Sequence, residues 1–269
     1  MMDKNALERS LASLNLPAVR YFDSLDSTNL EAARWLEVGA PNLALVLADE
    51  QTSGRGRAGR RWFTPPATAL AFSLILTGAE IQGDRAISRL SGLGAVAVTQ
   101  ALQEMYDLPA QIKWPNDVLV AGKKVAGVLI ELHWLGSQLA GAIIGIGINV
   151  TPESIPEPEY LSFPAGCIES ALGEPLDRLT LLREVLQRLI NWLPLLSTDA
   201  FREVWEKSLA YRGEQVQILR ERAPGTNEVL VAYQGCLVGL DEAGRLRVLD
   251  QAGSLIVIDV GELMLRPIV

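Results

Sequence analysis

The sequence of 269 residues is poor in the side chains that most often carry out nucleophilic and metal chemistry. Its single histidine, His133, excludes a multi-histidine metal site, and a histidine-assisted nucleophile would have to use this one residue. The two cysteines, Cys167 and Cys236, have no CxxC or Cys/His spacing, so we interpret them as reduced residues of a cytoplasmic protein. An enzyme of this composition would have to work with cations, carboxylates and backbone amides.

Long apolar runs and an excess of positive charge are also missing. No uninterrupted run approaches the roughly 18 apolar residues of a membrane-spanning helix, and the N-terminal segment lacks the apolar core of a secretory signal. The net charge of −8 disfavours general binding to nucleic acids and to anionic membranes. We therefore expect a protein with neither a membrane nor a nucleic acid as its partner.

The composition indicates a folded chain, with 49% apolar and 21% charged residues. Helical and strand-like patterns occur together over residues 1–211, which predicts an α+β domain with a mixed β-sheet flanked by helices. After Tyr211, short β-like runs are separated by Gly, Asp and Asn, which predicts a small β-barrel domain over residues 212–269.

Single elements follow from apolar periodicity and from turn residues. Thr28 and Glu31 have the spacing of a capping box within a predicted helix at 24–39, and Gly39 stands where that helix would end. The proline-rich segment 151–164 predicts a loop. The other predicted segments are strands at 43–48, 69–76, 110–114, 117–120, 125–131 and 138–150, helices at 84–107, 178–196 and 199–210, and β-runs at 215–219, 228–233, 236–240, 246–249 and 255–260.

The densest functional signal is GRGRAGRRW, residues 54–62, which follows a predicted strand. Glycines let a backbone approach a ligand closely, and arginines provide forked, permanently charged donors that suit phosphate. The segment also matches the GxGxxG pattern, but Pro65-Pro66 prevents the helix that a Rossmann fingerprint must open. An RGG-like nucleic-acid segment and a plain exposed basic loop are the other interpretations.

Two more motifs combine groups that can bind a nucleotide. KWPND, residues 113–117, has a cation, an aromatic ring, an amide and a carboxylate at the end of a predicted strand, and the following hairpin can return Lys124 to the same place. In GIGINV, residues 145–150, alternate glycines on a buried strand indicate that a strand or a ligand packs against the backbone. Each motif alone is also compatible with an ordinary turn, a solvated lysine or a tightly packed strand.

Taken together, these motifs resemble the biotin protein ligase family. The resemblance covers DSTN at 26–29, ADEQTSGRGRAGRRW at 48–62, KWPNDV at 113–118, KKVAGVLIE at 123–131 and GIGIN at 145–149. It is similar to the monofunctional type without an N-terminal DNA-binding domain. The resemblance implies a class II synthetase-like biotin/lipoate ligase fold with a small C-terminal SH3-like β-barrel.

The resemblance also implies roles for individual residues. Lys124 would bridge the biotin carboxylate and the α-phosphate, and Lys113, Asn116 and Asp117 would lie on the nucleotide and metal side of the pocket. We add the hypothesis that Asp117 orients or deprotonates the acceptor amine in the transfer step. The implied biotin contacts are Ser27, Thr28, Asn29, Gln51, Gly54, Arg55, Lys124, Gly127 and Leu129. The implied ATP or adenylate contacts are Arg57, Arg60, Trp62, Lys113, Asn116, Asn149 and Arg266. The implied catalytic residues are Arg57, Lys124 and Asp117, while metal ligands are not assigned.

The implied activity has two steps. Biotin reacts with ATP and Mg²⁺ to give biotinyl-5′-AMP and pyrophosphate, and biotin is then transferred to a lysine of a biotin carboxyl carrier protein. The alternatives are a lipoate or related acyl ligase, a protein that binds nucleic acid through the basic loop, and a biotin-sensing protein without catalysis. The sequence leaves open whether the chain forms a homodimer.

Overall fold

The computed structural model describes residues 2–161, 163–221, 229–259 and 263–268. A seven-stranded mixed sheet forms its larger part, in the order β1-β2-β3-β7-β6-β5-β4. The β1–β2 pair is parallel and the other pairs are antiparallel. The strands are β1 (Val19–Leu25), β2 (Ala44–Gln51), β3 (Ala69–Leu76), β4 (Ala110–Lys113), β5 (Asp117–Val120), β6 (Lys123–Leu135) and β7 (Gln138–Asn149).

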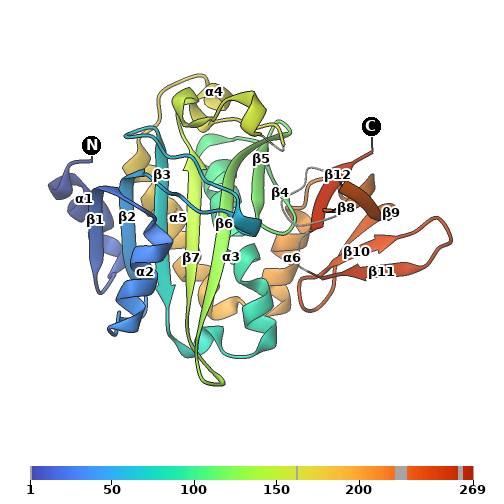
Figure 1. Ribbon diagram of the computed structural model, residues 1–269, viewed down its shortest axis with the longest axis horizontal. Coiled ribbons are helices and arrows are strands. Elements are labelled where there is room, and N and C mark those ends of the chain that lie inside the picture. Colours follow the sequence, from blue (N-terminus) through green and yellow to red (C-terminus); the bar gives the residue numbers. More distant parts are fainter. Residues whose placement is uncertain (1, 162, 222–228, 260–262, 269) are drawn as a thin grey trace.

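Helices cover both faces of this sheet (Figure 1). Successive strand residues point to opposite faces, so the apolar runs in β2 and β3 supply two cores. Ala44 and Val46 pack with Ala32 of helix α2 on one face, whereas Leu45 and Leu47 join the larger cluster with α3 and α5 on the other. The helices are α1 (Lys4–Leu11), α2 (Thr28–Glu37), α3 (Asp84–Tyr106), α4 (Ile168–Leu172), α5 (Arg178–Trp192) and α6 (Asp199–Lys207).

A second, antiparallel sheet of five strands follows, in the order β11-β10-β9-β8-β12. It lies beside the β4 end of the first sheet (Figure 1). Among the described residues no pairing joins its edge strands β11 and β12, so the recorded pairing is that of an open sheet. Its strands are β8 (Gln215–Glu221), β9 (Val229–Leu240), β10 (Leu246–Leu249), β11 (Leu255–Ile258) and β12 (Leu263–Pro267).

The inner side chains of this second sheet belong to the same hydrophobic cluster as the core of the first. Val216, Leu237 and Val248 are fully buried in that cluster together with Trp205 of α6 and Leu93 of α3. The mixed α+β architecture is confirmed. The division at residues 211 and 212 stays a prediction.

The predicted elements agree best where apolar runs are continuous, and they differ where long-range contacts intervene. The capping box is wrong: helix α2 begins at Thr28 after Ser27, without a side-chain cap. Thr28 and Glu31 are used elsewhere, because Thr28 donates to Gln51 and Glu31 pairs with Arg20. Helix α1, strand β1 and helix α4 were not predicted, and the loop 151–164 contains two short 3₁₀ turns at Pro152–Ser154 and Pro158–Tyr160.

Candidate active site

The centre of the candidate site is a pair of glycines that face each other on the adjacent strands β6 and β7. Gly127 lies opposite Gly147 in the register, and the indole of Trp62 packs over both. A Cβ atom at Gly147 would overlap the Trp62 ring, and one at Gly127 would approach it to 3.2 Å. The missing side chains therefore make room for a flat ring on the sheet, which explains the alternate glycines of GIGINV.

Beside this ring, one carboxylate lies between two lysines. Lys124 Nζ is 2.6 Å from Asp117 Oδ1, and Lys113 Nζ is 3.5 Å from Asp117 Oδ2. Strand pairing brings them together, since β4 and β6 both pair with β5, which begins at Asp117. Lys124 Nζ also lies 5.4 Å from the centroid of the Trp62 ring.

Burial and charge oppose each other in this cluster. Burial lowers the pKa of Lys113 from 10.5 to about 8, although Asp117 counteracts part of the shift. For Asp117 burial raises the pKa, but the charges of Lys124 and Lys113 outweigh it and the net pKa is lowered. Asp117 is therefore a carboxylate that stays ionised, and Lys113 is a lysine whose pKa of about 8 lies well below the ordinary value.

Further cations surround the cluster. Arg57 Nη1 donates to Asn116 Oδ1 at 2.9 Å, and the Asn116 amide in turn donates to the Val128 carbonyl at 2.8 Å. Burial lowers the pKa of Arg57, with Arg60 close enough to contribute to the shift. The cations of this group outnumber its carboxylate, so the site is built to receive an anion.

The Phe163 ring connects the cluster to the second sheet. Lys113 Nζ lies 4.7 Å from its centroid, and Arg266 Cζ of strand β12 lies 4.9 Å from it. Cations are attracted to the faces of aromatic rings, so Phe163 stabilises the positive charges of Lys113 and Arg266 near each other. Arg266 thus reaches the site from the C-terminal sheet, at the position where the resemblance places an ATP contact.

The residues assigned to biotin form a separate hydrogen-bonded group at the start of α2. The Gln51 Oε1 atom accepts from the backbone N–H of Thr28 at 2.9 Å and from its hydroxyl at 3.1 Å. Ser73 Oγ donates to Asn29 Oδ1 at 2.6 Å, and the Asn29 amide donates to Glu131 at 2.7 Å. Ser27, Thr28 and Asn29 are all buried, and this group is continuous with the glycine strand because Asn29 lies against Gly145.

The basic loop 54–62 is attached to the same group. Arg55 Nη1 lies 2.9 Å from Glu131 Oε1, and the backbone N–H of Trp62 donates to the Gly54 carbonyl at 2.9 Å. Gly54 is buried where a Cβ would overlap the Trp62 carbonyl. Arg60 is exposed at the tip of the loop.

Not every assigned residue contacts the cluster. The Asn149 amide is buried and donates to the Gly166 carbonyl at 3.0 Å, and Leu129 is half-buried on β6. Sequence reasoning missed Glu131, Ser73 and Phe163 as members of the site. Glu131 is the last residue of the KKVAGVLIE motif, so its place in that motif could have indicated a role in the site. Ser73 and Phe163 lie outside the motifs.

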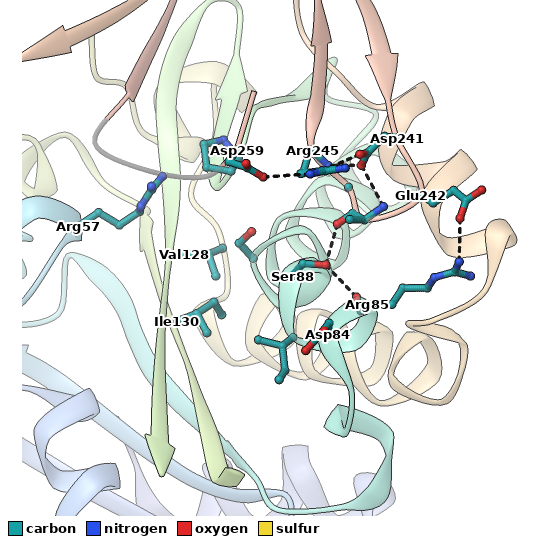
Figure 2. A pocket seen from close by; sticks show the side chains of 15 residues that line it. Arg57, Asp84, Arg85, Ser88, Val128, Ile130, Asp241, Glu242, Arg245 and Asp259 are labelled. Carbon is teal, nitrogen blue, oxygen red and sulfur yellow. Dashed lines mark hydrogen bonds and ion pairs between the residues drawn. The ribbon is translucent and has the colours of Figure 1, made fainter. Parts of the chain in front are cut away.

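A cleft of about 900 Å³ runs from Arg57 along strand β6. Figure 2 shows Val128 and Ile130 of β6 directed into it, with Asp84 on helix α3 and Asp259 near the second sheet at its borders. Beyond the end of β5, the only strand pairing recorded for β6 among the described residues is with β7. The cleft therefore lies beside an open strand edge next to the cationic cluster.

Two features are absent from the described part of the chain. No three His, Cys, Asp or Glu side chains there are placed to bind one metal ion together. None of the helices described combines the length and the apolar character needed to cross a bilayer.

Comparison with known proteins gives consistent matches. Residues 21–149 match the model of the Biotin/lipoate A/B protein ligase family. A biotin–[acetyl-CoA-carboxylase] ligase from Paracoccus denitrificans is 35% identical over 240 residues, which cover 86% of this chain and 94% of that protein. A bifunctional ligase/repressor from Bacillus subtilis is 38% identical over 166 residues, and the match spans only half of its length.

Solved structures agree with these matches. The biotin protein ligase from Aquifex aeolicus in complex with biotin and ATP superposes with a TM-score of 0.75 at 32% identity. The superposition covers 93% of this chain and 99% of that protein.

Proposed function

Since the chain belongs to the biotin/lipoate A/B protein ligase family, we propose that it is a biotin protein ligase. It would activate biotin with MgATP to give biotinyl-5′-AMP and then transfer biotin to a lysine of a biotin carboxyl carrier protein. The observation that carries this proposal is the Asp117 cluster of lysines, with Arg57 beside it, next to the Trp62 ring that packs over Gly127 and Gly147. This combination suits an acyl adenylate, in which an anionic phosphate joins the acyl group to a nucleoside with a flat adenine ring.

The first step suits a site that has cations and no histidine. A carboxylate that attacks the α-phosphorus of ATP is already ionised, so no general base is needed. Its difficulty is repulsion, which between unit charges at 4 Å is about 4 kcal/mol at an effective dielectric of 20. We propose that Lys124 and Arg57 offset this repulsion and stabilise the phosphoryl oxygens as the pyrophosphate leaves. Mg²⁺ would enter on the phosphates of ATP, because Asp117 is already engaged by two lysines.

The substrates would occupy the two halves of the site. We place biotin against the Thr28, Asn29 and Gln51 group, because polar groups buried there can bind a polar ring system. The nucleotide would lie towards Lys113, Phe163 and Arg266. The buried indole N–H of Trp62 has no hydrogen-bond partner among the described residues, so it is a donor that a ligand can satisfy.

In the second step a neutral lysine amine attacks the acyl carbon, and AMP leaves. The lowered pKa of Asp117 makes it a weak proton acceptor, so the geometry favours its role as an orienting group over that of a base. We expect Asp117→Asn to slow transfer from preformed biotinyl-AMP to the carrier, measured by single-turnover kinetics. Transfer at the wild-type rate would remove Asp117 from this step.

We propose that the carrier docks in the cleft beside the open edge of β6. The backbone of Val128 is already bonded to Asn116, so the free edge begins beyond it. A partner strand can pair with a free edge, and the half-buried Ile130 offers an apolar contact there. The same edge would serve a homodimer, in which case the two assemblies compete. Sedimentation of the protein with and without carrier distinguishes them, since a dimer that dissociates on carrier binding requires the shared edge.

The substrate assignment is tested by formation of the adenylate in a single turnover with Mg²⁺ and α-labelled ATP. Biotin and lipoate are run in parallel. Biotin-dependent adenylate supports the proposal, whereas lipoate-dependent adenylate would make the protein a lipoate ligase. Biotin binding without ATP consumption would make it a sensor. Salt-dependent binding to DNA or RNA would support the nucleic-acid alternative, which the net charge of −8 disfavours.

We propose that the protein is located in the cytoplasm. Its two free cysteines and its proposed use of ATP fit that location.

A further inference from the structure

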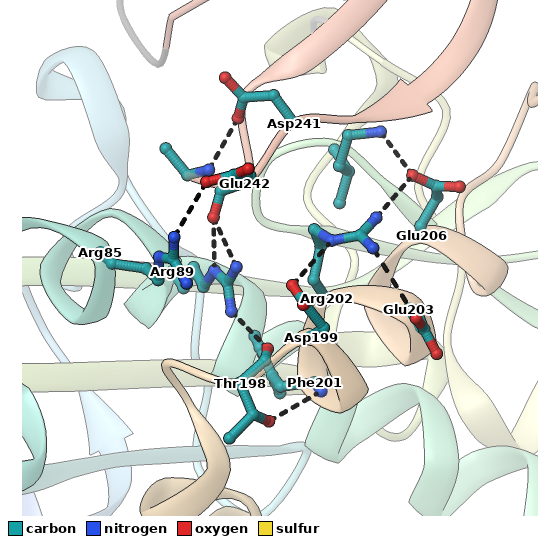
Figure 3. Close-up of polar contacts among 12 residues, drawn as sticks. Arg85, Arg89, Thr198, Asp199, Phe201, Arg202, Glu203, Glu206, Asp241 and Glu242 are labelled. Carbon is teal, nitrogen blue, oxygen red and sulfur yellow. Dashed lines mark hydrogen bonds and ion pairs between the residues drawn. The ribbon is translucent and has the colours of Figure 1, made fainter.

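The turn between β9 and β10 is bound to the larger part of the molecule by three successive backbone carbonyls. Arg89 of α3 donates to the Glu242 carbonyl through Nε at 3.1 Å, and Ser88 donates to the Ala243 carbonyl at 2.8 Å. The indole Nε1 of Trp114 donates to the Gly244 carbonyl at 3.0 Å. Figure 3 shows Arg89 directed at this turn from helix α3. Because side chains from two different elements hold one turn, its position relative to the first sheet is closely determined.

Trp114 is the member of this set that belongs to a site motif. It is only 3% exposed and stands in KWPND between Lys113 and Asn116. Its backbone neighbours carry the groups that face the substrates, since Lys113 and Asp117 both belong to the cationic cluster. The indole Nε1 is bonded to the carbonyl of Gly244, which is 130 residues distant in the sequence. The KWPND motif thus contains a side chain that is hydrogen-bonded to a backbone carbonyl far away in the sequence.

We propose that Trp114 is a positioning residue of the adenylation site, which acts by anchoring residues 113–117 to the Gly244 carbonyl. The hydrogen bond of the Trp114 indole goes to a backbone carbonyl and not to a group of the Asp117 cluster. By fixing the backbone of the motif, it keeps Lys113 and Asp117 opposite Lys124. The C-terminal sheet then contributes to catalysis as the support of KWPND, in addition to supplying Arg266. The expected effect on the reaction rate rests on the proposed function. The anchoring of residues 113–117 by Trp114 does not depend on that function.

The environment of Lys113 supplies a readout that a general packing role would not change. The groups that face its amine are the Asp117 carboxylate, the Lys124 amine, the Arg266 guanidinium and the Phe163 ring. Its pKa of about 8 depends mainly on burial, so any loosening of the motif that admits water moves that pKa back towards 10.5. The chain has only five lysines, which allows their side-chain signals to be followed separately by NMR.

The test compares Trp114→Phe with Ser88→Ala. Trp114→Phe keeps an aromatic ring but removes the donor together with part of the indole, while Ser88→Ala removes one hydrogen bond to the neighbouring carbonyl of the same turn. We expect Trp114→Phe to raise the pKa of Lys113, measured by NMR titration of labelled lysines with Lys113→Arg used for assignment. We also expect it to slow adenylate formation by about tenfold, because small displacements of positioned groups are costly in rate. Ser88→Ala should leave both at their wild-type values.

Two results would overturn the proposal. One is an unchanged Lys113 titration in Trp114→Phe, and the other is an equal change in Ser88→Ala, which would mean that the turn matters only for stability. If the wild-type protein forms no adenylate, the proposed function fails, and the titration alone still decides the anchoring role because it needs no substrate. Thermal unfolding of both variants verifies that each is folded at the temperature of the titration.

Discussion

At the scale of single residues, the site depends on how one buried carboxylate is shared. Asp117 accepts from both Lys113 and Lys124, so the cluster carries a net positive charge while its carboxylate stays ionised. Removing one partner of a buried charged pair leaves the other uncompensated and is costly. The two lysines are therefore not equivalent: Lys113 is almost fully buried with a low pKa, whereas Lys124 is partly exposed and reaches towards Trp62.

A pH dependence follows from Lys113. Its pKa in the folded protein is lowered from 10.5 to about 8, so the cation is present below this pH and is lost as the pH rises through it. If the cation binds the nucleotide, kcat/KM for ATP in adenylate formation falls about tenfold one pH unit above the pKa, since nine-tenths of the amine is then neutral.

The variant Lys113→Arg provides the control, because a guanidinium does not lose its proton in this range. The fall in kcat/KM above pH 8 should disappear in this variant, whatever its absolute rate. An unchanged alkaline fall would assign the titration to another group.

At the scale of elements, the β6–β7 pair is the floor of the site. Its glycines lie opposite each other at Gly127 and Gly147, and a single ring, Trp62 from the loop after β2, covers both. A strand made only of branched side chains would leave no room for this ring. The loop 54–62 is thus attached to the sheet at two points, by Trp62 at the glycines and by Arg55 at Glu131.

This arrangement predicts unequal effects of the same substitution at the two glycines. Gly147→Ala places a methyl group inside the Trp62 ring, whereas Gly127→Ala places one 3.2 Å from Trp62 and from Lys124. Overpacking costs about 1–3 kcal/mol, so we expect Gly147→Ala to lower the free energy of unfolding by that amount or to displace the indole and slow adenylate formation. Chemical denaturation and single-turnover kinetics of the two variants measure the difference. Equal, small effects would mean that Trp62 does not rest on Gly147.

At the scale of the whole molecule, the two sheets behave as one packed body. Their inner side chains belong to one hydrophobic cluster. Hydrogen bonds from Arg89 to backbone carbonyls add a polar connection between the two parts. Arg89 is fully buried and donates to the carbonyls of Leu196, Thr198 and Glu242. Figure 3 shows its contacts with Thr198 and Glu242. A buried cation that satisfies carbonyls from two separate segments ties the connection between α5 and α6 and the β9–β10 turn to helix α3.

We therefore expect Arg89→Met to be strongly destabilising. It removes several charge-assisted hydrogen bonds and leaves buried carbonyls without a donor, which costs about 3 kcal/mol or more. Arg85→Met is the matched control, since Arg85 lies one turn earlier on α3 and pairs with the side chain of the same Glu242. That pair is exposed, so its loss should cost under about 1 kcal/mol. Denaturant unfolding of both variants checks the prediction, and similar losses would contradict the role of Arg89.

Much of the site could be predicted from short motifs, because their members are close in the sequence or are joined by one hairpin. Lys113, Asp117 and Lys124 converge through the β4–β5–β6 pairing that the motif spacing indicates. Ser73 and Phe163 could not be predicted in this way, because one is an ordinary polar residue inside an apolar strand and the other lies in a proline-rich loop. Thr28 was predicted as a helix cap, but its hydroxyl is bonded to Gln51, whose position depends on the next strand.

The sequence by itself determined the chemistry available and the elements that carry it. The sequence has one histidine and a glycine–arginine loop, and both follow directly from composition and residue order. The apolar runs of β2, β3 and β7 form strands because their residues favour burial over a short, continuous stretch. Only the tertiary structure decided that Trp114 donates to Gly244 and that Arg89 binds the carbonyls of two distant segments. Every residue offers the same backbone carbonyl, so the choice of acceptor depends on how the two sheets pack and leaves no mark in the local pattern.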